Sequence, residues 1–219
     1  MKRVILNVAT GRYVIGQTRL RSRIVDADFL AWTEEMPPGS PSHQHTPFAF
    51  KTFALAEARR RGYDLALWAD SSILPIGPLP ELWAHIEREG HWFPNNGWNT
   101  GQWCADSALA PLGITREESF GIPHLAATAM GFNLHHTRTL QFVYLWLDHG
   151  RDGRSFRGPV RNDGGEASPD ARVLGHRWDQ TVASVLAWRL GMTFTDPPKF
   201  FAYKGGETAQ TLLVADGAY

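Results

Sequence analysis

Leu-Ala-Leu-Trp-Ala-Asp-Ser-Ser, residues 65–72, passes without a break from apolar side chains to a carboxylate and two hydroxyls. A short apolar run bounded by polar residues is typical of a strand buried on both faces, as in a parallel sheet. Ligands of such sheets bind beyond the carboxyl ends of the strands, where Asp70 lies. Its carboxylate could hold a divalent cation, and Ser72 faces the same way in an extended chain. An Asp after a strand also commonly caps a turn, so this simpler interpretation stays open.

Helices and strands alternate on both sides of this segment. Upstream, the apolar patterns predict strands over residues 4–9 and 28–32, and a helix that begins at Thr46-Pro47 and ends at Gly62. Such alternation predicts an α/β domain with a central, mostly parallel sheet flanked by helices. Downstream, we expect helices over 80–90, 138–148 and 179–190, a capping box at Thr115 and Glu118, a strand over 127–134, and a long loop over 91–106.

Length and composition set the class of protein. The 219 residues, 43% hydrophobic and 20% charged, suit a single domain over residues 1–219. The one cysteine, Cys104, excludes a disulfide framework and a four-cysteine zinc site. Because 22 basic residues balance 22 acidic ones, the chain does not have the charge of a nucleic-acid coat. No segment approaches the ~20 apolar residues of a membrane span, and no signal peptide is apparent, so we expect a cytoplasmic protein.

Polar residues also flank two other expected elements. Residues 176–180, His-Arg-Trp-Asp-Gln, open the last helix. Asp179 can be its N-cap, but the same position aims Asp179 and Gln180 at an anion-rich pocket, to which Arg177 could add a phosphate contact. Asn133 ends the strand over 127–134, and its donor and acceptor suit either the recognition of a hydroxyl or a turn.

Three irregular segments complete the chain. The loop of residues 95–106 carries Trp98 and Trp103, whose rings could stack on a sugar. Residues 150–170 are rich in glycine and charge, and we expect a mobile loop that closes over a ligand. Residues 193–219 are expected to form an extended C-terminal tail.

Gly11 to Thr18 nearly matches the phosphate-binding loop of nucleotide triphosphatases, and it follows a strand as that motif does. However, Gln17 stands in the place of the lysine that reaches the phosphates. The simpler alternative is a turn into a short helix.

Taken together, these motifs resemble nucleotide-sugar glycosyltransferases of the GT-A type, over about residues 3–192. Residues 47–51 and 62–72 are similar to the helix and the strand-plus-Asp-x-Asp element of that superfamily. Residues 131–133, Gly-Phe-Asn, are similar to the Phe-Asn segment of glycogenin-like and bacterial galactosyltransferase-like enzymes. Residues 178–180, Trp-Asp-Gln, are similar to their Asp-Gln segment.

The resemblance implies a sugar-nucleotide donor, a divalent cation (Mn²⁺ or Mg²⁺) and an acceptor that could be a glycan, a lipid, a protein or a modified nucleic-acid base. It implies that Asp70, Ser72 and His176 hold the metal and that Asp179 and Gln180 are catalytic. The donor would be bound by the side chains of Asp70, Ser72, Asn133, Arg19, Arg177, Trp98 and Trp103. The chain departs from the pattern at Ser72, where a second carboxylate is expected, and it lacks a recognisable late His-x-x-Gly segment.

Three functions therefore stand after the sequence. The first is a hexosyltransferase-like glycosyltransferase, in which Asp70, Asn133 and Asp179 converge around one cleft. The second is a sugar-nucleotide- or carbohydrate-binding module that keeps the fold without catalysis, and the reduced Asp70-Ser71-Ser72 motif favours it. The third is a phosphotransferase that uses Gly11 to Thr18.

Overall fold

A central sheet organises the chain, whose computed structural model describes residues 1–196 and 199–217. The strand order is β2-β1-β3-β8-β5, and β8 is antiparallel to both of its neighbours, whereas β1 pairs in parallel with β2 and β3. The mostly parallel α/β sheet expected from the sequence is therefore confirmed. The strands are β1 (Arg3–Ala9), β2 (Asp28–Thr33), β3 (Leu65–Ala69), β5 (His91–Trp92) and β8 (Ala129–Asn133).

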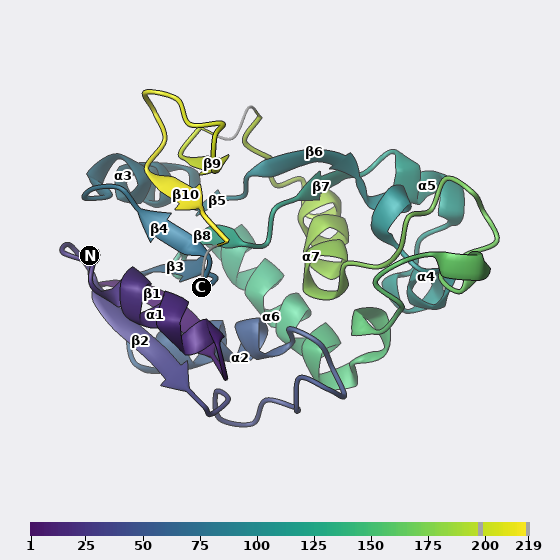
Figure 1. The fold of residues 1–219 in the computed structure, drawn as a ribbon, viewed down its shortest axis with the longest axis horizontal. Coiled ribbons are helices and arrows are strands. Elements are labelled where there is room, and N and C mark those ends of the chain that lie inside the picture. The colour runs from purple at the N-terminus through teal and green to yellow at the C-terminus, as the bar shows by residue number, and fades with distance from the viewer. Residues whose placement is uncertain (197–198, 218–219) are drawn as a thin grey trace.

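Helices cover both faces of this sheet, because alternate residues of the buried strands point to opposite sides. In β3, Ala66 and Trp68 pack into one apolar cluster, and Leu65, Leu67 and Ala69 pack into the other. The first cluster lies beneath α2 (Phe50–Arg60), α6 (Thr137–Asp152) and α7 (Trp178–Arg189), and the second beneath α1 (Tyr13–Arg21) and α3 (Pro80–Glu89). Figure 1 shows β1 and β2 towards one end of the molecule, α4 (Asp106–Leu112) and α5 (Arg116–Phe120) at the other, and α6 and α7 between them.

The C-terminal segment folds back instead of extending. Its strands β9 (Phe201–Tyr203) and β10 (Leu213–Ala215) join β4 (Ile73–Pro75) in a small sheet of order β4-β10-β9. Because β4 directly follows the Asp70-Ser71-Ser72 turn, the end of the chain packs beside that turn. The expectation of an extended tail is thus wrong for the described part of residues 193–219; residues 197–198 and 218–219 lie outside the described residues.

Residues 91–106 are more ordered than the loop that the sequence predicts. They contain β5, the strand β6 (Asn95–Asn99), which pairs with β7 (Pro123–Leu125), and the short helix η1 (Thr100–Trp103). Glycine and asparagine side chains hid this strand from the apolar pattern. In the same region, Thr115 caps α5 in a capping box with Glu118, as expected.

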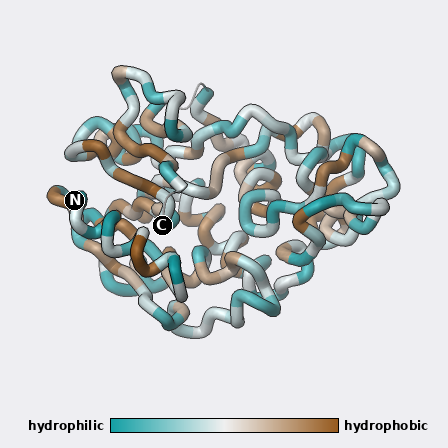
Figure 2. Tube along the Cα trace, in the orientation of Figure 1, coloured by the Kyte–Doolittle hydropathy of each residue, from teal (hydrophilic) through white to brown (hydrophobic). Residues whose placement is uncertain are grey.

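Residues 150–170 begin inside α6 and continue through the short helices η2 (Arg154–Phe156) and η3 (Asp163–Gly165). In Figure 2 the outer loop after α6 is largely hydrophilic, yet Ser155, Phe156 and Ala167 are buried. The segment is therefore anchored at several points, and its movement over a ligand stays a prediction.

Candidate functional site

Asp70 lies immediately after β3, at the end of the sheet where the sequence places it. Its backbone N–H donates to the Thr128 carbonyl (2.9 Å), and the indole N–H of Trp68 donates to its Oδ1 (2.7 Å). The side chain is 31% exposed. The carboxylate is thus held in one orientation, with part of its surface open to solvent.

Lys51 of α2 joins the two predicted acidic positions. Its Nζ lies 3.1 Å from Asp70 Oδ1 and 2.8 Å from Asp179 Oδ2, and it donates to the carbonyl oxygen of Ala127 (2.8 Å). The side chain is only 3% exposed. Burial opposes the charge of this ammonium, but the attraction of Asp179 and Asp70 outweighs it, so the pKa of Lys51 is raised. The sequence analysis gave Lys51 no role, because a single lysine on a helix face is an ordinary solvated residue.

Asp179 lies in the first turn of α7, facing the ammonium of Lys51. Its side chain is 6% exposed. Burial raises its pKa to about 6, against the opposing attraction of Lys51. The predicted N-cap role is absent, since α7 begins at Trp178 and its N-cap residue, Arg177, makes no side-chain cap. Asp70 and Asp179 are therefore brought together, as expected, with a cation between them.

A cleft of about 310 Å³ opens beside this group. That volume is at the lower end of the range typical of small-molecule sites. Aromatic rings form much of its wall and the Asp70–Ser72 turn forms its polar edge. It is lined by Val8, Ala9, Thr10, Tyr13, Met36, His43, Phe48, Phe50, Trp68, Asp70, Ser71 and Ser72.

Gly11 to Thr18 does not form a phosphate-binding loop. Helix α1 begins at Tyr13, so Gly16 and Gln17 lie inside it and are buried. The Gln17 amide donates to Asn7 Oδ1 (2.8 Å) and to the Trp32 carbonyl (3.1 Å). Gln17 is thus a structural residue, and the phosphotransferase hypothesis loses its motif.

Asn133 lies at the wrong end of the sheet for the predicted site. Because β8 is antiparallel to β3, Asn133 pairs with Leu65, and Ala129 pairs with Ala69 beside Asp70. At ~3.3 Å per residue, the two ends of β3 are roughly 13 Å apart. The Asn133 amide instead donates to the Glu87 carbonyl (3.2 Å). The expected convergence of three positions is therefore wrong for Asn133 and holds for the other two.

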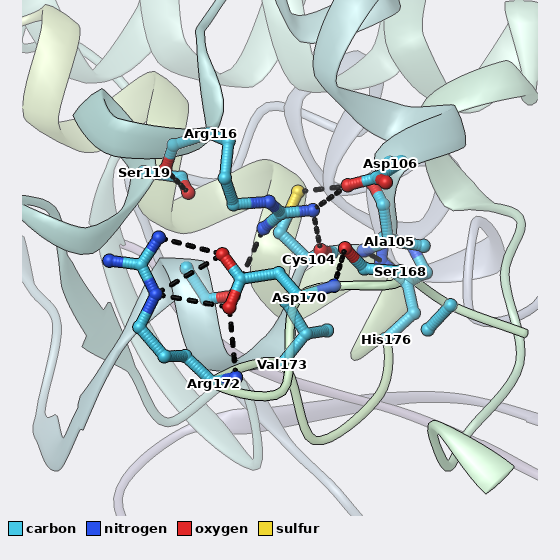
Figure 3. A network of polar contacts seen from close by, with 12 residues as sticks. Cys104, Ala105, Asp106, Arg116, Ser119, Ser168, Asp170, Arg172, Val173 and His176 are labelled. Atoms are coloured by element: carbon cyan, nitrogen blue, oxygen red, sulfur yellow. Dashed lines mark hydrogen bonds and ion pairs between the residues drawn. The ribbon is translucent and has the colours of Figure 1, made fainter. Parts of the chain in front are cut away.

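His176 is fully buried away from Asp70. Its Nδ1 accepts from the N–H of Ala105 (3.3 Å), and its Nε2 faces the Ser155 carbonyl (3.1 Å). Figure 3 shows it beside Ala105 at the edge of the polar network built around Arg116. Burial lowers its pKa to about 4. It fixes residues 155 and 105 to the start of α7, and its predicted role as a metal ligand is wrong.

The two arginines predicted at the diphosphate are held by protein contacts. Arg19 pairs with Asp216 (2.9 Å) and donates to the Ser72 carbonyl (3.3 Å), which fastens the C-terminal strand to the Asp70–Ser72 turn. Arg177 donates to the Val160 carbonyl (2.7 Å) and lies over the Trp103 ring, with Cζ 3.8 Å from its centroid. Both positions lie near the candidate site, but each shown contact supports the scaffold.

Gln180 projects towards β7. Its Nε2 donates to His124 Nδ1 (3.0 Å), and its Oε1 accepts from the Ala127 N–H (3.4 Å). His124 is buried, which lowers its pKa to about 3, so the ring is neutral. Asn96 Nδ2 donates to the same His124 Nδ1 (3.1 Å). A row of polar groups therefore leads from the start of α7 to β6.

The residues present do not fit a protein-held divalent cation. Among residues 1–196 and 199–217, no cluster of three or more His, Cys, Asp or Glu side chains could hold a metal ion. Ser72 replaces one carboxylate, and Lys51 already lies between Asp70 and Asp179. Hard divalent cations take six or more oxygen ligands, so Asp70 and Ser72 alone would leave most positions to substrate and water.

Comparison with solved structures decides the fold. No protein-family model and no curated sequence matches the chain. Mouse xyloside xylosyltransferase 1 superposes with a TM-score of 0.54 at 9% identity, over 99% of this chain and 98% of the other. The chain has a GT-A glycosyltransferase fold. The same GT-A fold is shared with a glycosyltransferase involved in the glycosylation of the major capsid of PBCV-1, with a TM-score of 0.50 at 13% identity, over 98% of this chain and 92% of the other.

The bifunctional glycosyltransferase WbbM also matches the GT-A fold of this chain. Its TM-score is 0.52 at 9% identity, over 97% of this chain, which spans 45% of the length of WbbM. The resemblance stated from the motifs is thereby confirmed at the level of the fold. In the described part of the chain, no helix has the length and apolar character needed to cross a membrane.

Proposed function

We propose that the protein is a glycosyltransferase that moves a sugar from a nucleotide-diphosphate donor to an acceptor. One observation carries the proposal: at the rim of an aromatic cleft in a GT-A fold, Lys51 joins the carboxylates of Asp70 and Asp179, which follow β3 and begin α7. Buried charges are costly unless they are paired, and a fold keeps such a group where its chemistry is used.

The cleft supplies surfaces that suit such a donor. Tyr13 and Phe48 offer rings against which a nucleobase can pack, and the Ser71 and Ser72 hydroxyls lie at the polar edge. The exposed part of Asp70 can accept hydrogen bonds from sugar hydroxyls. Lys51 offsets the negative charge of Asp70, which would otherwise repel the donor diphosphate.

Asp179 acts in this proposal as a positioning residue. It is nearly buried, so its carboxylate works on the ammonium of Lys51 rather than on bulk solvent. By holding Lys51, it fixes Asp70 in the orientation that faces the cleft. The groups are fixed before substrate arrives, which lowers the cost of ordering them during transfer.

A metal ion has no assigned step in the proposal. Mn²⁺ or Mg²⁺ would find Asp70 and Ser72 at the cleft edge and would depend on the donor diphosphate for further ligands. The acceptor class and the retention or inversion of configuration are separate questions from donor binding.

Calorimetric titration of UDP- and GDP-sugars, each in Mn²⁺ and in EDTA, tests the proposal. We expect one donor to bind, and Asp70→Ala to weaken that binding at least tenfold. Asp64→Ala is the matched control, since Asp64 precedes β3 at the opposite end, where it bonds to His135. The absence of binding by every donor would overturn the proposal.

The second candidate is a donor-binding module without catalysis. The near-complete burial of Asp179 and the loss of a carboxylate at Ser72 favour it. Donor hydrolysis, which competes with transfer in the absence of acceptor, separates the two. Binding with no release of nucleoside diphosphate after a long incubation would support the module.

A further inference from the structure

Trp98 is exposed although the loop around it is rigidly built. Its side chain is on a residue with 47% exposure. The side chains on both sides hold the backbone: Asn95 Oδ1 accepts from the Gly97 N–H (3.0 Å), and Asn96 Oδ1 accepts from the Trp98 N–H (3.1 Å). Gly97 has φ +82°, a conformation that favours glycine. The loop thus fixes a large ring in contact with solvent.

Neighbouring groups fix the ring as well as the backbone. Trp98 meets Trp103 edge to face, with centroids 5.7 Å apart and planes at 88°. Arg177 lies over Trp103 and donates to the Val160 carbonyl. Trp98, Trp103 and Arg177 therefore form one stacked assembly, which we call the tryptophan platform. A ring that is held before binding loses little conformational entropy on binding, as in pre-organised binding surfaces.

The platform is joined directly to the candidate transfer centre. The Trp103 carbonyl accepts from the Arg177 N–H (3.2 Å) and from the Thr181 hydroxyl (2.5 Å). Arg177 is followed by Trp178, whose ring lies 5.2 Å from that of Phe48 in the cleft wall, and then by Asp179. Three consecutive residues at the start of α7 thus contact the platform, the cleft wall and Lys51. Figure 1 shows β6 and β7 beside α7.

Side-chain amides surround the exposed ring. Asn96 connects through His124 to Gln180. Asn99 uses its Oδ1 for the Gln102 N–H (3.0 Å), and its Nδ2 has no hydrogen-bond partner in the described parts of the chain. A flat apolar ring beside amide donors complements a sugar, which has an apolar face of C–H groups and an edge of hydroxyls. A lipid tail would require a continuous apolar groove instead.

We propose that the tryptophan platform is the acceptor subsite and that the acceptor is a carbohydrate, with one sugar ring stacked on Trp98. The proposal rests on the proposed function, because it gives the second substrate of that transfer a place beside Asp179 and Gln180. It commits to a glycan among the four acceptor classes that the sequence left open.

A glycan array tests the proposal with the full chain, fluorescently labelled and saturated with the nucleoside diphosphate of whichever donor binds in calorimetry. We expect the wild type to bind a defined set of glycans and Trp98→Ala to lose at least about tenfold in affinity for them. Trp188→Ala is the matched control, because Trp188 is 44% exposed in the last turn of the same helix, α7. It should bind as the wild type does.

The calorimetric donor affinity of Trp98→Ala separates this proposal from the proposed function. We expect that affinity to equal the wild-type value, because Trp98 does not line the donor cleft. If no donor binds even to the wild type, the proposed function fails and the acceptor subsite fails with it. If the donor binds but the wild type binds no glycan, or Trp98→Ala binds glycans as tightly as the wild type, the acceptor subsite alone is overturned. Unfolding curves of the variants confirm that each is folded.

Discussion

The ammonium of Lys51 and the carboxylate of Asp179, on helices α2 and α7, lie 2.8 Å apart with almost no exposure to solvent. This contact crosses from the first half of the chain to its last helix. Since Asp70 shares the same ammonium, the two acidic positions depend on one cation. The properties of the site should therefore respond together when this cation is changed.

Replacement of Lys51 by methionine should destabilise the protein by about 3 kcal/mol at pH 7.5, because it leaves a buried carboxylate without its partner. At pH 5 the loss should be smaller, since Asp179 is then largely protonated. Urea unfolding at both pH values measures this. Lys199→Met, at an exposed lysine, should change the free energy of unfolding by less than about 0.5 kcal/mol. Equal losses at the two pH values would show that the charge of Asp179 is not involved.

Asp179 should titrate near pH 6, well above its ordinary value of 3.8. Because its pKa is raised in the folded state, this group stabilises the fold fully below pH 3.8, and the contribution is lost as the pH rises through about 6. Carboxyl ¹³C chemical shifts over pH 3–8 measure the midpoint directly. Donor affinity should fall below about pH 6, since protonated Asp179 no longer pairs with Lys51. A midpoint near 4 would contradict the burial of this carboxylate.

Asn133→Ala should leave donor affinity within about twofold of the wild type and lower the free energy of unfolding by about 1–2 kcal/mol, because the Glu87 carbonyl loses its donor. Calorimetry and urea unfolding check the two parts. A variant that stays fully stable but no longer binds donor would return Asn133 to the site.

Gln17→Leu should cost about 1–3 kcal/mol of stability, because Asn7 loses a buried hydrogen bond. Gln210→Ala, at an exposed glutamine, serves as the control. Titration of ATP into the wild type should give no binding heat. Saturable ATP binding that Gln17→Leu abolishes would revive the phosphate-loop hypothesis.

Removal of metal should have a modest effect. We expect EDTA to lower donor affinity by less than about tenfold, because Asp70 and Ser72 provide few of the six ligands that such a cation needs. Mn²⁺ titrated alone at millimolar concentration should give no saturable heat. Complete loss of donor binding in EDTA would show that a metal site forms from groups that the donor itself supplies.

Much of the fold followed from local patterns. Val4–Ala9 and Leu65–Ala69 are strands because their apolar side chains fill both faces of a sheet, and Pro80 and Gly90 bound a helix as such residues commonly do. Strand direction was the main error. Pattern alone does not tell which way β8 runs, and its reversal moved Asn133 to the far end of the sheet.

The site was predictable where chemistry is visible in the chain and unpredictable where it arises from packing. Asp70 and Asp179 stand at the ends of recognisable elements. Lys51 was missed because its importance comes from two partners distant in sequence and from burial that no local pattern signals. His176 was assigned wrongly because a buried histidine bonded to backbone groups has the same letter as a metal ligand.

The reversed direction of β8 places main-chain atoms, not side chains, opposite the two ionic residues of the first half of the chain. The carbonyl of Ala127 accepts from Lys51, and that of Thr128 accepts from the Asp70 N–H. Such acceptors are present whatever amino acid is encoded at 127 or 128. Mutational drift can therefore rewrite this stretch without dismantling the centre, which is one way that an architecture can outlast any recognisable trace of common ancestry in its letters.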